Sequence, residues 1–233
     1  FVDKTPMLAE LMESNTKVTL FTRPRRFGKT LNQSMIQRFF EKEITESGGI
    51  TDNRYLFDGL AVSSCGGDIM EHCQQYPVIT ISLKSAKQPD YQMAYSCLID
   101  DIAREFRRHS YVLETDSISE AQKEEFRQLC DKAAAPDGYA KSFLFLSECL
   151  AKYHGRNVFI LIDEYDVPLE NAYFAGFYDE MIAFIRSFFE SALKTNRYLE
   201  KGVVTGCLRI SRESIFTGLN NMEADSVLNT KYG

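Results

Sequence analysis

The feature that most constrains the fold is a run of apolar residues, Val158 to Ile162, that ends directly in Asp163 and Glu164. A strand that is apolar at every position must be covered on both faces, as in a parallel sheet between two layers of helices. Such a sheet is built from alternating strands and helices. The run therefore predicts an α/β fold in which this strand is buried on both sides.

Strands and helices alternate along the rest of the chain, which predicts βαβ units and a mainly parallel sheet. Further strands are expected at Lys17 to Thr22, Val78 to Leu83 and Val203 to Leu208. Helices are expected at Leu31 to Phe40, Tyr95 to Phe106, Glu120 to Lys132, Phe143 to Tyr153 and Met181 to Ala192. The helical period places a set of apolar residues on one face of the first helix: Leu31, Met35, Ile36, Phe39 and Phe40.

Two strand patterns bear on the edges of the sheet. The strand Val78 to Leu83 has one polar face, formed by Thr80 and Ser82, and this suits a sheet edge better than a sheet centre. After Leu208 no segment has a convincing strand pattern. We therefore expect the chain to end before a fifth strand.

Composition and charge exclude several classes of protein. The chain has 233 residues, of which 44% are hydrophobic, and a formal net charge of −6. This balance argues against a surface dedicated to nucleic acid or to anionic membranes. No apolar run approaches the roughly 20 residues of a membrane helix, and the six cysteines form no CxxC pair. We expect a cytoplasmic protein with reduced thiols.

A Gly-Lys-Thr sequence, Gly28 to Thr30, lies between the first strand and the first helix. In this setting the backbone N–H groups and the helix N-terminus can wrap a phosphate chain. Lys29 would reach the outer phosphates, and the Thr30 hydroxyl would hold Mg²⁺. The residues expected to form the phosphate-binding loop are Arg25, Arg26, Phe27, Gly28, Lys29, Thr30 and Leu31.

Arg23 occupies the position where such loops normally have their first glycine. An arginine there must adopt a more ordinary backbone geometry, which leaves the loop shape and the nucleotide affinity open. A surface turn whose basic cluster caps a helix is the alternative. Arg25 and Arg26 could face the phosphates, or pair with carboxylates of the surface or of another protomer.

Asp163 and Glu164 end a strand, and the C-terminal ends of parallel strands form the ligand edge of such sheets. Asp163 would hold Mg²⁺ there, directly or through water, and Glu164 would act as general base on the attacking water. The alternative is a helix N-cap, because acidic residues are favoured at helix starts in any protein.

In phosphate-loop proteins with a glutamate after the acidic strand, one more strand separates that strand from the loop strand. Here the separating strand would be Val203 to Leu208. Thr205 is then the leading candidate to orient water or the terminal phosphate, and Arg209 is the next. The alternatives are an ordinary strand residue for Thr205 and a loop anchor for Arg209.

Three blocks of the sequence together resemble the AAA-ATPase-like family of prokaryotic proteins. They are Phe21 to Asn32 (FTRPRRFGKTLN), Phe159 to Leu169 (FILIDEYDVPL), and Gly202 to Ser211 (GVVTGCLRIS) with Ser214 to Asn221 (SIFTGLNN). Phe1 to Thr5 and Tyr55 to Leu60 are also similar, so the resemblance covers nearly the whole chain. In that family an arginine at the position of Arg23 is the normal form.

The resemblance implies a three-layer P-loop NTPase fold of the additional-strand class, with strand order 5-1-4-3-2. It implies ATP and Mg²⁺ as ligands and a single domain over residues 1–233, incomplete at its C-terminus. It also implies a nuclease-like C-terminal region in the full-length protein, and oligomerisation is common among such ATPases. A nucleic-acid partner is an analogy that the acidic charge of this chain does not support.

We therefore expect a P-loop domain that binds ATP and hydrolyses it with Mg²⁺. The alternative is a nucleotide-binding switch or scaffold module with little or no hydrolysis. A small-molecule kinase fits less well, because Glu164 and the separating strand are not typical of that class.

Overall fold

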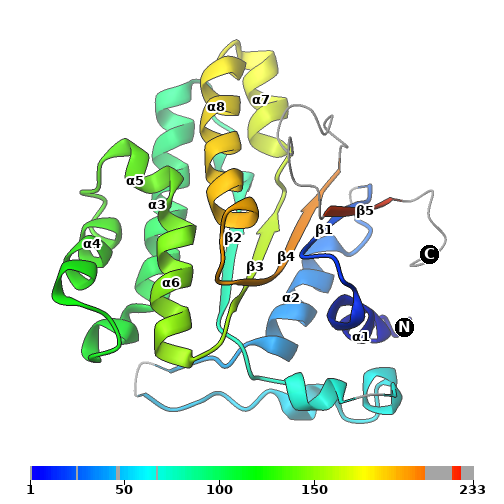
Figure 1. Cartoon of the computed structure of the whole chain (residues 1–233). Coiled ribbons are helices and arrows are strands. Elements are labelled where there is room, and N and C mark those ends of the chain that lie inside the picture. Colours follow the sequence, from blue (N-terminus) through cyan, green and yellow to red (C-terminus); the bar gives the residue numbers. More distant parts are fainter. Residues whose placement is uncertain (1, 25, 46–47, 67, 208–221, 227–233) are drawn as a thin grey trace.

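The computed structural model describes residues 2–24, 26–45, 48–66, 68–207 and the backbone of 222–226. In these ranges a sheet lies between two layers of helices (Figure 1). The strands are β1 (Val18–Thr22), β2 (Val78–Ser82), β3 (Val158–Asp163), β4 (Leu199–Gly206) and β5 (Met222–Ser226). The α-helices are α1 (Pro6–Glu13), α2 (Lys29–Phe40), α3 (Tyr91–Arg108), α4 (Glu120–Cys130), α5 (Pro136–Ala140), α6 (Ser142–His154), α7 (Val167–Ala175) and α8 (Tyr178–Phe189). Short helical turns lie at η1 (Arg54–Phe57), η2 (Ala61–Ser64), η3 (Ile69–His72), η4 (Leu83–Ala86), η5 (Ser110–Glu114) and η6 (Glu190–Lys194).

The strand order is β2-β3-β4-β1-β5, and every neighbouring pair is parallel. This is the order 5-1-4-3-2 that the family resemblance implies. β4 lies between β1 and β3, as the separating strand was expected to do, although it begins at Leu199, before the predicted start at Val203. β2 lies at an edge of the described sheet, as its polar face predicted.

The expectation that the chain ends before a fifth strand is wrong. β5 pairs with β1 in parallel, with Leu20 opposite Ala224. Glu, Ala and Asp, which make up most of its sequence, are poor strand formers, so a pattern search passes over the segment. The open edge of β1 supplies backbone hydrogen-bonding groups that override this weak preference.

The sheet separates two hydrophobic clusters, and β3 contributes to both. Ile160 and Ile162 pack into the cluster formed with α3, α6 and α8, whereas Phe159 and Leu161 pack into the cluster formed with α1 and α2. Alternate residues of a strand point to opposite faces, so a strand that is apolar throughout contributes side chains to both hydrophobic clusters. The burial predicted for Val158 to Ile162 is confirmed on both faces.

The apolar face expected for α2 is partly wrong. Ile36, Phe39 and Phe40 are buried, but Leu31 is 73% exposed and the first buried residue of the helix is Gln33. At 3.6 residues per turn, Leu31 and Ile36 are about 140° apart around the helix, so they cannot share a narrow face. α7, which follows Asp163 closely, was also not anticipated; Pro168 lies in its first turn, where a proline is compatible with a helix.

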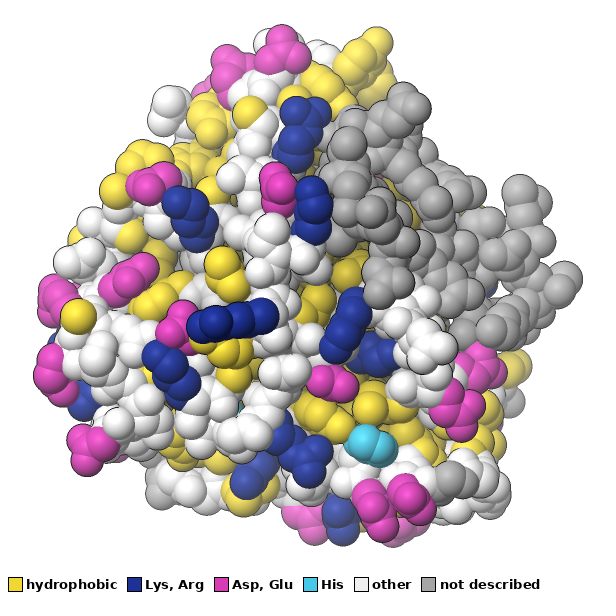
Figure 2. Space-filling model, in the orientation of Figure 1, with side chains coloured by type: hydrophobic (Ala, Val, Ile, Leu, Met, Phe, Trp, Pro, Cys, Tyr) yellow, Lys and Arg dark blue, Asp and Glu magenta, His cyan; other side chains and the backbone are white. Residues whose placement is uncertain are grey.

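On the face that carries α3, α6 and α8, basic and acidic side chains are scattered among neutral and hydrophobic ones (Figure 2). The described part of this face shows no continuous basic band of the kind that binds a phosphate backbone. None of the helices in the described ranges is both long enough and apolar enough to cross a bilayer.

Candidate functional site

The loop between β1 and α2 turns sharply before the helix begins. Gly28 is the N-cap of α2 and has a left-handed backbone, with φ of 73°. Arg26 is also left-handed, with φ of 71°. Left-handed residues beside a helix start can turn successive N–H groups toward one point, which makes a concave site for anions. The loop geometry therefore suits the phosphate binding that the Gly-Lys-Thr sequence predicted.

The Lys29 ammonium lies within its own loop. Its Nζ donates hydrogen bonds to the carbonyl oxygens of Arg23 at 2.8 Å and Pro24 at 2.9 Å. It also lies 3.3 Å from Sγ of Cys207, which follows β4. These contacts hold the positive charge at the centre of the loop, where a phosphate chain would be enclosed.

The Asp163 carboxylate joins three elements at the carboxyl edge of the sheet. It is buried, and its Oδ2 accepts a hydrogen bond of 2.7 Å from the Thr30 hydroxyl at the start of α2. Its Oδ1 accepts hydrogen bonds from the Thr205 hydroxyl on β4 and, at 2.9 Å, from the N–H of Glu164. The sequence-predicted residues Thr30, Asp163 and Thr205 are thus brought together.

Thr30 and Asp163 form a donor set that fits Mg²⁺. A hydroxyl and a carboxylate are both hard oxygen ligands, and Mg²⁺ is held in phosphate sites by one or two such groups together with phosphate oxygens. The two side chains come from different elements and already lie at hydrogen-bond distance. A metal held by both would tie the phosphate loop to β3.

Glu164 directly follows Asp163 in the sequence and has a left-handed backbone, with φ of 53°. This conformation is uncommon for a residue other than glycine, and it turns the chain sharply out of β3. The Glu164 carbonyl accepts a hydrogen bond from the N–H of Val167, which begins α7. Glu164 is partly exposed beside the buried Asp163, so the two adjacent carboxylates have different surroundings.

Three residues that sequence reasoning missed connect this turn to β4. The N–H of Tyr165 donates to the Thr205 carbonyl at 3.1 Å, and Oδ2 of Asp166 accepts a hydrogen bond from the N–H of Cys207 at 2.9 Å. A Cβ added to Gly206 would lie 2.5 Å from the Tyr165 ring and 2.7 Å from Oδ1 of Asp166. The available signal was the glycine that follows Val203, Val204 and Thr205, since a glycine in a strand often marks a close approach of another part of the chain.

Gln33 is a further residue that was not anticipated. Its buried amide donates a 2.9 Å hydrogen bond to the carbonyl of Ile162, one residue before Asp163. This bond fixes the N-terminal part of α2 against the end of β3. A pattern search has little reason to single out this residue, because glutamine is ordinarily exposed.

The other predicted loop residues are placed as follows. Arg26 is exposed, Phe27 is 58% exposed and Leu31 is 73% exposed. Arg25 and Arg209 lie outside the described residues. The structure thus places Arg26, Phe27 and Leu31 around the loop without a packed role.

A family model described as "Predicted AAA-ATPase" matches residues 1–216. The chain belongs to this family. Among curated proteins, it is 26% identical over 228 residues to "Uncharacterized protein in vnfD 5'region" of Azotobacter chroococcum mcd 1. That alignment covers 97% of this chain and 37% of the relative, so the chain spans well under half of the relative's length. No solved structure matches the chain significantly.

In this AAA-ATPase family member, a groove of about 670 Å³ begins at Thr30 and Asp163 and runs away from the loop. Its floor is formed by β2 and β3, and its walls by α2 and α3. The polar face of β2, Thr80 and Ser82, is part of the floor. α2 packs over β3 and β4, which leaves this strip of sheet uncovered.

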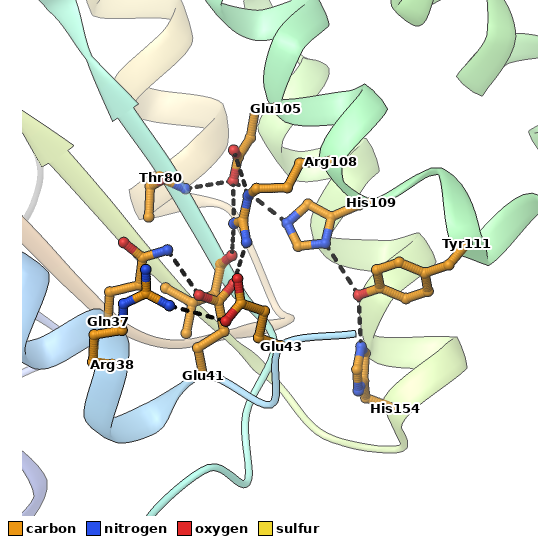
Figure 3. A network of polar contacts seen from close by, with 11 residues as sticks. Gln37, Arg38, Glu41, Glu43, Thr80, Glu105, Arg108, His109, Tyr111 and His154 are labelled. Carbon is orange, nitrogen blue, oxygen red and sulfur yellow. Dashed lines mark hydrogen bonds and ion pairs between the residues drawn. The ribbon is translucent and has the colours of Figure 1, made fainter. Parts of the chain in front are cut away.

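An ionic cluster lies at the far end of the groove, and Figure 3 shows its side chains. Arg108 pairs with Glu105 at 2.7 Å and with Glu41 after α2, and it donates to the Val78 carbonyl. Glu105 accepts a 2.6 Å hydrogen bond from the N–H of Thr80. Two backbone groups of β2, the Thr80 N–H and the Val78 carbonyl, are thus bound by side chains of α3.

The cluster continues as a chain of hydrogen bonds to α6 (Figure 3). Glu105 lies 3.4 Å from Nε2 of His109, Nδ1 of His109 lies 3.1 Å from the Tyr111 hydroxyl, and this hydroxyl lies 2.9 Å from Nε2 of His154. A consistent arrangement has both histidines neutral: Tyr111 donates to Nδ1 of His109, His154 donates to Tyr111, and the N–H at Nε2 of His109 faces Glu105 without a well-formed hydrogen bond.

The charges within this cluster are strongly shifted. Burial raises the pKa of Glu105, but the Arg108 charge, the N–H of His109 and the hydrogen bonds from Arg108 outweigh burial and bring that pKa to about 2. Burial, followed by the Arg108 charge, lowers the pKa of His109. Burial, followed by His109 and Lys42, lowers the pKa of His154 to about 3. At neutral pH the cluster therefore contains an ionised Glu105 and two neutral histidines.

Proposed function

We propose that residues 1–233 form one P-loop domain of the additional-strand class that binds ATP with Mg²⁺ and hydrolyses it. The observation that carries this proposal is the meeting of Thr30 and Asp163, from α2 and β3, next to the loop that encloses Lys29. The parallel order 5-1-4-3-2 and membership of a family of predicted ATPases support it.

In this proposal each side chain has one task. The Lys29 ammonium leaves the loop carbonyls and binds the outer phosphate oxygens, while Thr30 and Asp163 hold the metal. Mg²⁺, when bound, supplies positive charge that offsets the charge on the phosphate oxygens. Glu164 takes a proton from the water that attacks the terminal phosphorus, and the products are ADP and phosphate. Contact of Arg25, Arg26 or Arg209 with the phosphates remains a proposal.

The first test is MgATP binding by calorimetry on this chain and on Lys29→Ala. We expect the substitution to abolish measurable binding, because it removes the cation that the loop encloses. Lys84→Ala removes an exposed lysine on η4 and is the matched control. If Lys29→Ala bound MgATP as tightly as the unaltered chain, the loop would not be the nucleotide site.

The second test is ATP turnover by Glu164→Gln. We expect a decrease of about 10²- to 10⁴-fold with MgATP binding retained, because glutamine cannot accept the proton from water. The assay belongs on the full-length protein, since the chain matches part of a longer relative. Turnover that survived the substitution unchanged would remove Glu164 from the mechanism.

A nucleotide-binding switch with little hydrolysis is the second candidate. The observation that favours it is the binding of Lys29 by the Arg23 and Pro24 carbonyls in a loop that lacks its usual first glycine. Equilibrium dialysis that detected bound ATP, with turnover no faster than in buffer, would establish the switch. Significant turnover by the full-length protein would eliminate it.

Partners of the full-length protein are also proposals. The family resemblance implies a nuclease-like region beyond the ATPase domain, and oligomerisation through the domain is common in such enzymes. A role in handling DNA therefore belongs to the longer protein. If that protein did not bind DNA at low salt, where phosphate contacts are strongest, this role would be abandoned.

A further inference from the structure

The groove between α2 and α3 is not used by the proposed mechanism. One end of the groove is formed by Thr30 and Asp163, the pair assigned to the metal. From there the groove extends along β2 and β3 toward Arg108. The terminal phosphate of ATP would be freed at the first of these ends. We propose that the groove is a binding route for inorganic phosphate, through which this product leaves the site; the assignment to a product rests on the proposed function.

The groove can accept an anion in spite of its acidic residues, because its lining holds three carboxylates and three arginines. Each of the three carboxylates in its lining already accepts hydrogen bonds from the protein. Asp101 accepts from Ser85 and Arg104, Glu105 accepts from the N–H of Thr80 and from Arg108, and Asp163 accepts from Thr30 and Thr205. Their negative charge is therefore partly compensated before any ligand enters.

Hydrogen-bond donors remain for a ligand on two sides of the groove. The Arg104 side chain is 74% exposed and makes one contact, through Nη1 to Asp101 at 2.7 Å, within the described part of the chain. Most of its N–H donors are therefore available to an oxyanion. The Thr80 and Ser82 hydroxyls on the floor can donate as well.

The α2 wall offers acceptors. The amide nitrogens of Gln33 and Gln37 donate to the Ile162 carbonyl and to Glu41, so the side-chain oxygens of these two lining residues are the groups that could accept from a ligand. Phosphate near neutral pH carries one or two protons and can donate to such acceptors while it accepts from Arg104. A fully deprotonated anion has no proton to donate and could not form hydrogen bonds with these acceptors.

Two features argue for small-ion passage over docking of a polypeptide strand. A strand could add to the sheet only through the outer edge of β2, and there Glu105 and Arg108 already bind the Thr80 N–H and the Val78 carbonyl. The volume of about 670 Å³ is far larger than one phosphate ion, as expected for a route rather than a closed pocket.

The test is phosphate binding in the absence of nucleotide, measured by ³¹P NMR titration with inorganic phosphate. Lys29→Ala removes phosphate held in the loop, so binding that remains in this variant reports on the groove. We expect Lys29→Ala to retain one phosphate site, and addition of Arg104→Gln to weaken it about five- to tenfold. Thr80→Val, which keeps the side-chain shape, should weaken it about threefold.

Arg38→Gln is the matched control. Arg38 is an exposed arginine on α2 that pairs with Glu43 much as Arg104 pairs with Asp101, and it does not line the groove. We expect phosphate binding to be unchanged in this variant. Thermal unfolding of each variant verifies that it is folded, and the exposure of Arg104 predicts an unchanged Tm.

Loss of all phosphate binding in Lys29→Ala would overturn the proposal, as would equal weakening by Arg104→Gln and Arg38→Gln. If the groove bound phosphate but the full-length protein did not turn over ATP, the anion site would be supported and the proposed hydrolysis would be rejected. In an active full-length protein, Arg104→Gln should change the rate of phosphate release, followed by stopped flow, and leave MgATP affinity unaltered.

Discussion

At the residue scale, the lack of space around Gly206 predicts that a larger residue there destabilises the protein. Gly206→Ala would place a Cβ within 2.7 Å of Tyr165 and Asp166, which are both buried and cannot move freely. We expect the free energy of unfolding to fall by about 1–3 kcal/mol. Gly138→Ala is the control, since its Cβ would meet only the Ala134 Cβ at 3.6 Å. Urea unfolding measures both, and equal stabilities would contradict the packing described.

Thr205 contacts Asp163 rather than open space, which gives it a positioning role in the proposed site. Thr205→Val removes the hydroxyl and leaves one carboxylate oxygen with fewer donors. We expect the Mg²⁺ concentration for half-maximal ATP binding to rise about tenfold, while ATP binding without Mg²⁺ is unchanged. Thr205→Ser restores the hydroxyl and should restore the Mg²⁺ dependence. A purely structural role would affect both kinds of binding alike.

At the scale of elements, the hydrogen-bond chain between α3 and α6 makes stability depend on pH. The pKa of His154 is about 3 in the folded protein, against an ordinary value of 6.5. As pH falls below about 6.5 the unfolded chain binds a proton that folded His154 does not, so stability is full above this pH and is lost below it. The loss reaches up to about 1.4 kcal/mol per pH unit.

This pH dependence can be assigned by substitution. We expect His154→Gln to reduce the slope of unfolding free energy between about pH 5 and pH 7. Glu105 does not contribute to the slope in this pH range. Its stabilising effect is lost only as pH falls from about 4.5 to about 2. An unaltered slope in His154→Gln would show that His154 is protonated in the folded protein.

The same elements show what the sequence could and could not predict. β3 and the Gly-Lys-Thr loop were predictable because apolar content and residue order act locally. β5 was not, because its pairing with β1 outweighs the weak strand preference of its residues. Gln33 and Arg108 were missed for another reason: their partners Ile162, Glu41 and Val78 are distant in sequence, and hydrogen bonds of this kind leave no periodic trace.

At the scale of the whole molecule, the roles of the two sheet faces can be compared. The face with α3, α6 and α8 is covered by a large apolar cluster, which suits a rigid support. The face with α1 and α2 is covered less completely, and the polar groove lies where the cover ends. The candidate site thus lies at the boundary between a packed layer and an open strip of sheet, and α2 can respond to a ligand without disturbing the larger cluster.

The Glu105 and Arg108 side chains bound to β2 also affect how the sheets of two copies of this protein could pair edge to edge. A filament built by adding sheet to sheet needs two open edges on every copy, because each copy must join a neighbour on either side. At the β2 edge the Thr80 N–H and the Val78 carbonyl are bound by side chains of α3. A neighbouring strand would have to displace these two contacts before it could pair with β2, so crowding of this protein disfavours fibres built by joining sheets edge to edge.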